Sequence, residues 1–264
     1  MSERPLILLS NDDGIYARGI HALAETLSSV ADLYIVAPHM ERSAFSHALT
    51  ISSPLRVQQI DSKPYCNQIF EVNGTPVDCV KIGLDKIMPK KPDLVVSGIN
   101  RGANMGTDIL YSGTVGAAME ALINGCPAIA MSCHGPFTSD LNYHAAAELA
   151  RELVESRDLW FDPKNSWMLN VNAPTGYFDD LKGVKSASLG LRLYDDSYWK
   201  KTDPRGRDYY WLGADSQKHV DIDGSDCNYL DQGFATMTTL KPSMLADDGQ
   251  DHLVRNLSDF NLKK

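Results

Sequence analysis

The sequence contains no apolar run that approaches the roughly 20 consecutive residues of a membrane-spanning helix. The short apolar run after Pro5 is followed at once by acids, so it is too short for the core of a secretory signal peptide. An excess of positive charge is also lacking, since the formal net charge is −9, and this argues against a broad nucleic-acid surface. These absences predict a cytoplasmic protein that binds neither a membrane nor a nucleic acid duplex. A small anionic ligand, which needs only a local positive site, is not excluded.

Paired cysteines and known nucleotide-binding fingerprints are missing as well. The five cysteines form no CxxC pair and are odd in number, which predicts free thiols in a reducing compartment. The pattern GxxxxGK[ST] is absent, and the glycines after the first apolar run do not have the dinucleotide-binding spacing. A P-loop nucleoside triphosphatase is therefore excluded.

Short apolar runs alternate with helical periodicity over the first 175 residues. The runs 5–9, 33–38, 92–100, 127–132 and 167–174 are predicted strands. Predicted helices cover the apolar positions between Ile20 and Leu27, a segment that begins near Pro76, and the segments 114–124 and 144–156. This alternation predicts an α/β fold with a mostly parallel sheet flanked by helices, in which ligands bind beyond the carboxyl ends of the strands.

Two adjacent carboxylates, Asp12 and Asp13, follow the first predicted strand and precede Gly14. Carboxylate oxygens are suitable ligands for Mg²⁺ or Mn²⁺, and a cation would offset the repulsion between the two acids. The alternative is that one aspartate caps the next helix while its neighbour is merely solvated. From this pair alone, the helix cap is the better interpretation.

The segment 97–121, SGINRGANMGTDILYSGTVGAAMEA, changes that interpretation. It carries five glycines and leads from the third predicted strand into a helix near Thr114. A Ser-Gly-Thr turn at a helix N-terminus gathers backbone N–H groups and two hydroxyls where the helix dipole favours an anion, so Ser112, Gly113 and Thr114 predict a phosphate site. Long glycine-rich loops inside compact domains are uncommon without a function. A phosphate site at a second strand end favours a metal between the acids and the phosphate.

A further polar segment, 38–50, follows the second predicted strand and contains Arg42, Ser43 and His47. Such a loop could place one oxygen on a metal, and the alternative is an ordinary polar surface loop.

Several of these segments together resemble the stationary-phase survival protein SurE family of metal-dependent nucleotide phosphatases. The matching text is LLSNDDG, RSAFSHALT, NGTPVDCVKIGL, PDLVVSGINRGANMGTDILYSGTVGAAMEA and LNVNAP. It covers the N-terminal two-thirds nearly continuously, whereas the C-terminal third matches only loosely, through SDCNYLDQGFATMTTL. The resemblance implies a Rossmann-like α/β fold with an extended C-terminal β-hairpin, assembled as dimers or tetramers.

The resemblance also implies one divalent metal ion per subunit, Mg²⁺ or Mn²⁺, and a set of site residues. The metal ligands would be Asp12, Asp13, Ser43 and Asn100. The phosphate-side residues would be Asn104, Ser112, Gly113 and Thr114. Asp12 and Asp13 are also the catalytic candidates, with Asp13 as the candidate acceptor of the proton of the attacking water. Two positions depart from the family pattern: Ala44 replaces a common glycine, and His47 replaces a frequent asparagine.

The implied activity is hydrolysis of nucleoside 5′-monophosphates, and in some members of 3′-monophosphates and short polyphosphate. Two other functions stay open on the residues alone. One is a nucleotide-binding or sensing module without turnover, and the other is a phosphatase that acts mainly on polyphosphate or sugar phosphates. Nothing in the sequence predicts how a base would be recognised.

Beyond about residue 175 the pattern changes to aromatic residues mixed with charges around a Pro-Arg-Gly turn. This pattern predicts a protruding hairpin that forms a subunit interface. The alternative is a hairpin folded back on its own domain. We expect one domain, 1–264, with a catalytic core over 1–175 and a hairpin and oligomerisation region over 176–264.

Overall fold

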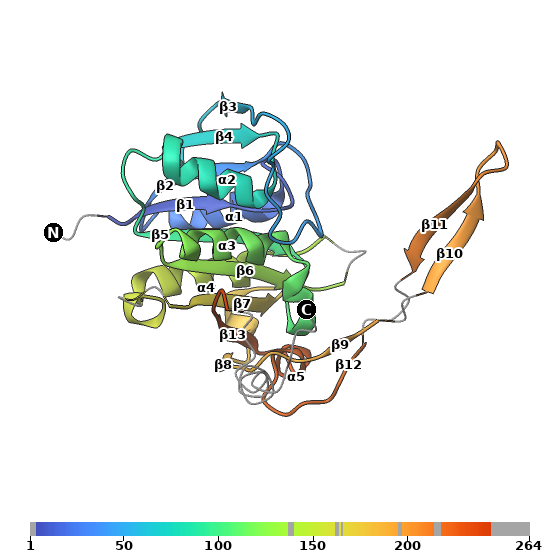
Figure 1. The fold of residues 1–264 in the computed structure, drawn as a ribbon. Helices are drawn as coiled ribbons and strands as arrows, with labels where there is room; N and C mark the ends of the chain where they lie inside the picture. The colour runs from blue at the N-terminus through green and yellow to red at the C-terminus, as the bar shows by residue number, and fades with distance from the viewer. Residues whose placement is uncertain are drawn as a thin grey trace, which may run out of the picture.

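The central feature of the fold is one large sheet (Figure 1). The computed structural model describes residues 4–136, 140–161, 164, 166–194, 197–213 and 218–243, so the tail 244–264 of the expected oligomerisation region lies outside it. Within the described residues, nine strands pair in the order β3-β4-β2-β1-β5-β6-β7-β13-β8. They are β1 (Leu6–Ser10), β2 (Asp32–Pro38), β3 (Val57–Ile60), β4 (Gln68–Val72), β5 (Leu94–Arg101), β6 (Ala128–His134), β7 (Met168–Pro174), β8 (Val184–Ser186) and β13 (Ala235–Leu240).

The middle of this sheet is parallel, as the sequence predicts. Strands β4, β2, β1, β5, β6 and β7 run in one direction. All five residues of β1 are buried, because helices cover both faces of a parallel sheet and leave no solvated side. The chain order reverses between β1 and β5, so the crevice between their carboxyl ends is the expected place for a ligand.

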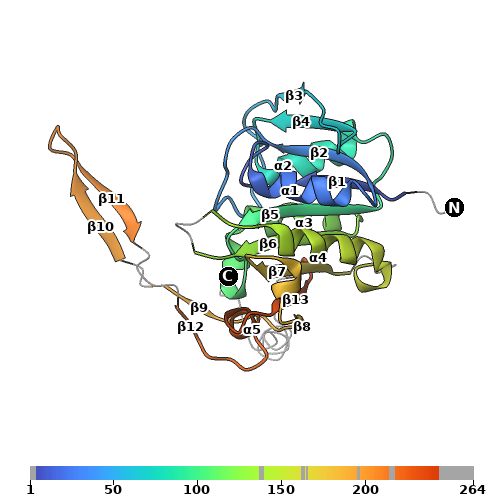
Figure 2. The ribbon, with the colours of Figure 1, turned by 180° about the vertical axis from the view of Figure 1, so that it is seen from behind.

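Helices form one layer on each side of the sheet. Helices α1 (Arg18–Leu27) and α4 (His144–Glu155) share one core, in which Ile20 and Leu23 lie with Leu149. Helices α2 (Pro76–Ile82) and α3 (Gly113–Ile123) contribute Val80 and Val115 to the second core, on the opposite face. Figure 2 shows α1 and α4 in front of the sheet. None of the described helices is long and apolar enough to cross a bilayer.

The C-terminal region contributes to the sheet and also leaves it. Strand β13 pairs antiparallel with β7 and carries β8 on its other side. Strands β9 (Arg192–Leu193) and β12 (Lys218–His219) pair with each other, and α5 (Asp226–Asp231) precedes β13. Between β9 and β12, the antiparallel hairpin of β10 (Ser197–Thr202) and β11 (Asp208–Gly213) stands away from the body (Figures 1 and 2). The expected hairpin is therefore present and is not folded back on the domain.

A buried carboxylate, Glu120, joins the two helices α2 and α3. Its side chain is 5% exposed and forms an ion pair with Lys81 of α2 at 2.9 Å. It also accepts hydrogen bonds from His47 and from Asn124, both at 2.9 Å. Burial alone would raise the pKa of Glu120, but these hydrogen bonds outweigh it and hold the pKa at about 2.

This lowered pKa predicts a pH dependence of stability. The free carboxyl group titrates near 4.5, so the ionised side chain stabilises the fold fully above that pH. The contribution is lost as the pH falls through the folded value of about 2. The difference in free energy of unfolding between wild type and E120Q, measured with urea, should therefore shrink between pH 4.5 and pH 2. A difference that stays constant over this range would contradict the assignment.

Candidate active site

Three loops meet at the carboxyl ends of β2, β1 and β5. Asp12 and Asp13 follow β1, the loop with Ser43 follows β2, and Asn100 lies near the end of β5. The backbone N–H of Arg42 donates to the carbonyl of Asp12 at 2.7 Å, and that of Arg101 donates to Asp13 Oδ2 at 2.9 Å. Each of these donors is a direct neighbour of a predicted ligand. The structure therefore brings the four predicted metal ligands to one edge of the sheet.

Asp12 is buried at the N-terminus of α3, with 4% of its surface exposed. Its Oδ1 accepts a hydrogen bond from the hydroxyl of Thr114. Burial raises the pKa of Asp12 in spite of this bond and of backbone bonds from Gly113 and Thr114. The carboxylate is thus held in place, in a position where its negative charge is unfavourable without a cation.

Asp13 is half-buried beside it, on a turn in which Gly14 has φ +97°. Burial, and after it the charge of Asp12, raise the pKa of Asp13 to about 6. Burial and the charge of Asp13 in turn raise the pKa of Tyr143, next to α4, to about 12. The phenol of Tyr143 therefore lies within electrostatic reach of Asp13, a placement that no sequence pattern indicates.

The two remaining predicted ligands keep oxygen lone pairs available. Asn100 donates through Nδ2 to the carbonyl of Gly102 at 2.8 Å, which leaves its amide oxygen as an acceptor. Ser43 donates its hydroxyl proton to Glu41 at 2.6 Å and keeps lone pairs on Oγ. Between Ser43 and His47, Ala44 and Ser46 have φ values of 58° and 55°. Ala44 thus adopts the left-handed conformation in which a glycine would be unstrained.

This donor set fits a hard divalent cation. Two carboxylates, an amide oxygen and a hydroxyl are ligands of the kind that Mg²⁺ and Mn²⁺ bind, and the raised pKa values of the pair reflect a charge that such a cation would offset. Among the residues that the structure describes, no three carboxylate, imidazole or thiol groups gather at one point. A site here would therefore depend on the neutral oxygens of Ser43 and Asn100 as well.

Three of the four predicted phosphate-side residues, Ser112, Gly113 and Thr114, lie at the start of α3. Ser112 caps the helix, with its Oγ accepting from the N–H of Val115 at 3.1 Å. A Cβ on Gly113 would lie 2.8 Å from Asp12 Cβ and 2.9 Å from Asp12 Oδ2, so only glycine allows this approach. The hydroxyl and backbone of Thr114 face Asp12, so a phosphate bound here would share these donors with that carboxylate.

Two asparagines of β7 hold Asn104 in place through hydrogen bonds to its backbone. Asn172 accepts from the N–H of Asn104 at 2.8 Å and donates to its carbonyl at 3.0 Å. Asn170 donates to the same carbonyl at 2.8 Å, and Asn104 Nδ2 donates to Ser132 at 2.9 Å. The sequence patterns identified LNVNAP as a strand and as part of the family resemblance, and this role was missed. Two asparagines at alternate positions of an otherwise apolar buried strand are the signal that could have found it.

Arg42 has a place in the site that no sequence pattern predicts. Its backbone N–H contacts Asp12, and its guanidinium lies 5.4 Å from the centre of the Phe45 ring. Its Nε is buried without a hydrogen-bond partner, which makes it a candidate donor to an anion at this edge.

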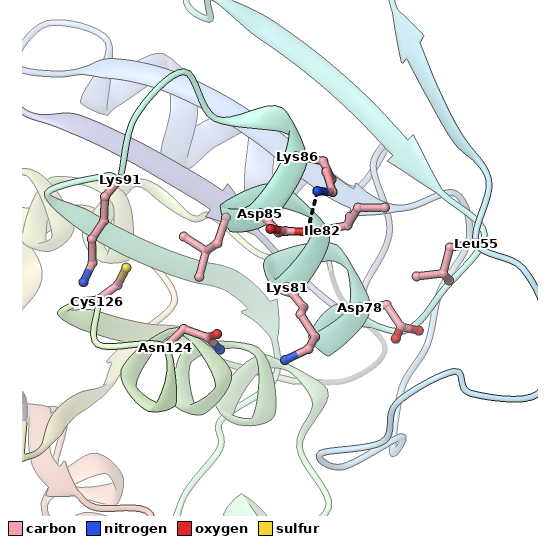
Figure 3. Close-up of a pocket in the computed structure, with 10 residues that line it drawn as sticks. Leu55, Asp78, Lys81, Ile82, Asp85, Lys86, Lys91, Asn124 and Cys126 are labelled. Atoms are coloured by element: carbon pink, nitrogen blue, oxygen red, sulfur yellow. Dashed lines mark ion pairs between the residues drawn. The ribbon is translucent and has the colours of Figure 1, made fainter.

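The large cavity in Figure 3, about 720 Å³, lies away from this edge, between α2 and the C-terminal end of α3. None of the predicted site residues lines it.

Comparison with known proteins identifies relatives over most of the chain. The family model described as "Survival protein SurE" matches residues 7–196. A protein of Syntrophotalea carbinolica named "5′-nucleotidase SurE" is 45% identical over 89% of this chain and 90% of its own length. One of the same name from Vibrio campbellii is 44% identical over 93% and 92%. The crystal structure of SurE protein from Aquifex aeolicus superimposes with a TM-score of 0.82 at 36% identity, covering 97% of this chain and 100% of that one.

Proposed function

The chain belongs to the survival protein SurE family, and from this premise we propose that it is a divalent-metal-dependent phosphomonoesterase that hydrolyses nucleoside 5′-monophosphates. The observation that carries the proposal is the pairing of Asp12 with the N-terminus of α3. A buried carboxylate and a helix N-terminus, whose N–H groups favour an anion, are held against each other there by Thr114 and Gly113. The names of the relatives support a nucleotidase, and the donor chemistry supports the metal.

In this proposal Asp12, Asp13, Ser43 and Asn100 hold one Mg²⁺ or Mn²⁺ ion. When bound there, such an ion would polarise a phosphoryl oxygen and lower the pKa of a water ligand. Thr114 orients the Asp12 carboxylate through its hydroxyl. Ser112, the amides at the start of α3 and Asn104 bind the equatorial oxygens of the phosphate, where negative charge is spread in the transition state.

The test is phosphate release from a panel of substrates, measured with Mn²⁺, with Mg²⁺ and with EDTA. We expect release from AMP or GMP that EDTA abolishes. Nucleotide binding without release would instead establish a sensing module. Faster turnover of short polyphosphate or a sugar phosphate than of every nucleoside 5′- or 3′-monophosphate would establish a phosphatase of another substrate class.

We further propose that the β10–β11 hairpin joins subunits into dimers or tetramers. Trp199 and Trp211 are opposite each other in the register of the hairpin and are 46% and 65% exposed. Tyr198, Tyr210 and Leu212 are each more than half exposed as well. A two-stranded hairpin is only marginally stable by itself, and exposed aromatic residues are typical of the centre of an interface. These features support burial of the hairpin against another subunit.

Replacing both Trp199 and Trp211 with lysine should therefore dissociate the oligomer. Loss of two aromatic anchors of about 2 kcal/mol each would weaken association by about 10³-fold. Light scattering after size-exclusion chromatography should show a smaller particle for the double variant. K201A, on the same hairpin, should keep the wild-type mass. An unchanged mass in the tryptophan variant would show that the hairpin is not the contact.

We propose a cytoplasmic location on the basis of the thiols. All five cysteines are free, as the sequence predicts. They are also buried, and burial raises the pKa of every one of them. Protonated, unpaired thiols are typical of proteins in reducing compartments.

A further inference from the structure

The loop that carries Ser43 is held on both sides of that residue. Before Ser43, the N–H of Arg42 is fixed to Asp12 and that of His39 to Val72 at 2.9 Å. After it, Ser46 contributes two hydrogen bonds, from its N–H to Tyr111 at 3.0 Å and from its Oγ to Leu110 at 2.6 Å. The position of Ser43 is thus set by what its loop contacts, because Ser43 itself is exposed.

The same loop is fastened to the helices α2 and α3. His47 Nε2 contacts Glu120 Oε2 of α3 at 2.9 Å. Further along, Thr50 binds Asp78 of α2 through its N–H at 3.0 Å and its hydroxyl at 2.5 Å. The contact between His47 and Glu120 differs from the others in this loop. It joins a side chain at the end of the Ser43–His47 turn to an ionised carboxylate that is almost fully buried.

The turn between Ser43 and His47 has a conformation that needs such support. Ala44 and Ser46 both have positive φ, which side chains with a Cβ rarely adopt. Backbone of this kind persists only where the surrounding contacts over-determine it. His47 lies directly after the second strained residue, so its contact with Glu120 restrains the backbone of the turn.

Glu120 suits this purpose because α2 and α3 each supply a partner for its carboxylate besides the loop. Lys81 and Asn124 both contact its Oε1 at 2.9 Å, while His47 uses Oε2. Figure 3 shows Lys81 extending from α2 toward α3, with Asn124 at the end of α3. The carboxylate is therefore a rigid anchor, built by two helices and presented to the loop.

We propose that His47 and Glu120 are positioning residues: their contact holds the turn at Ala44–Ser46 so that Ser43 reaches the metal held by Asp12 and Asp13. This inference rests on the proposed function. It assigns a role to His47, which departs from the family pattern, and to a buried carboxylate that touches neither metal nor substrate.

The variants H47A, H47Q and K81M separate this role from simple packing. H47A removes the contact between loop and anchor, and H47Q keeps a side chain that can donate to Glu120. K81M removes the ammonium group of Lys81 from Glu120 and leaves the loop contact intact. Partners that orient metal ligands typically change metal affinity by about 10–100-fold when mutated.

Two measurements are needed, calorimetric titration with Mn²⁺ and hydrogen exchange of the backbone amides over 43–50. We expect H47A to weaken Mn²⁺ binding about 10–100-fold and to speed exchange in this loop, with H47Q within about threefold of wild type. K81M should match wild type in both, although its thermal stability falls as much as that of H47A. Equal effects of K81M and H47A on Mn²⁺ binding, or no effect of H47A, would overturn the inference.

The exchange measurement also distinguishes failure of the inference from failure of the proposed function. If the wild type binds no Mn²⁺, the metal-dependent function is wrong. Faster loop exchange in H47A, but not in K81M, would still establish the anchor in that case. Unchanged exchange in H47A would overturn the anchor whatever the wild type binds.

Discussion

Asp13→Asn is expected to abolish metal-dependent phosphate release from AMP or GMP. The substitution keeps the size of the side chain and an oxygen that can accept the hydrogen bond from Arg101, but it removes one of two charges that would hold the cation. Loss of about 4 kcal/mol of charge stabilisation in the transition state corresponds to a decrease of about 10³-fold in kcat/KM. The decrease is measured as phosphate release at saturating Mn²⁺.

The stability of D13N should not be lower than that of the wild type. Because Asp12 and Asp13 repel each other in the metal-free protein, removing one charge should leave the metal-free unfolding temperature unchanged or higher. D85N is a matched control, since Asp85 is an exposed aspartate paired with Lys86, away from the sheet edge. It should retain wild-type kcat/KM. Normal turnover in D13N would remove Asp13 from the metal site.

Gly113→Ala should impair both activity and stability. Alanine at the start of a helix ordinarily stabilises it, because glycine costs about 0.5–1 kcal/mol more in backbone entropy. Here the new methyl group would lie 2.8 Å from Asp12 Cβ and 3.2 Å from Pro76 Cγ, so the carboxylate or the helix must move. We expect a loss of about 1–3 kcal/mol in the free energy of unfolding. We also expect a decrease of about 10²-fold in kcat/KM, since a displacement of about 1 Å has this effect at an active site.

A glycine remote from the site provides the comparison. Gly206 lies in the turn of the β10–β11 hairpin at φ +79°, and a methyl group added there would meet only open space. G206A should lose about 1 kcal/mol of stability from its strained backbone, with kcat/KM per subunit unchanged. Should G113A keep wild-type kcat/KM, the close approach of Asp12 to α3 would have no part in catalysis.

The parallel strands β1, β2, β5, β6 and β7 and the helices α1 to α4 of the core could be predicted from the sequence because their signals are local. Periodicity identified β1, β5 and β7 and the faces of α1 and α4. The edge pair β3–β4 was missed although its partners are close in the chain, because β3 is mostly exposed and has no apolar pattern. The antiparallel insertion of β13 beside β7 was missed because these partners are far apart in the chain and leave no mark on local periodicity.

The candidate site was also predicted only in part from local patterns. Asp12, Asp13 and the Ser-Gly-Thr turn were identified from their positions at strand ends, whereas Ser43 and Asn100 came only from the family resemblance. The supports of the site could not be found locally. Asn172 and Glu120 lie in a strand and a helix whose sequences resemble those of ordinary core elements. Their partners, Asn104 and His47, are 68 and 73 residues away in sequence.

The short β9–β12 ladder has a consequence for how this protein can vary. Lys218 pairs with Leu193, so the chain returns to the body at the place from which it departed, and the whole hairpin lies beyond that closure. The length and the aromatic residues of the hairpin can therefore change during evolution without altering the register of any strand in the main sheet. The proposed subunit contact and the candidate active site therefore lie on separate parts of one chain.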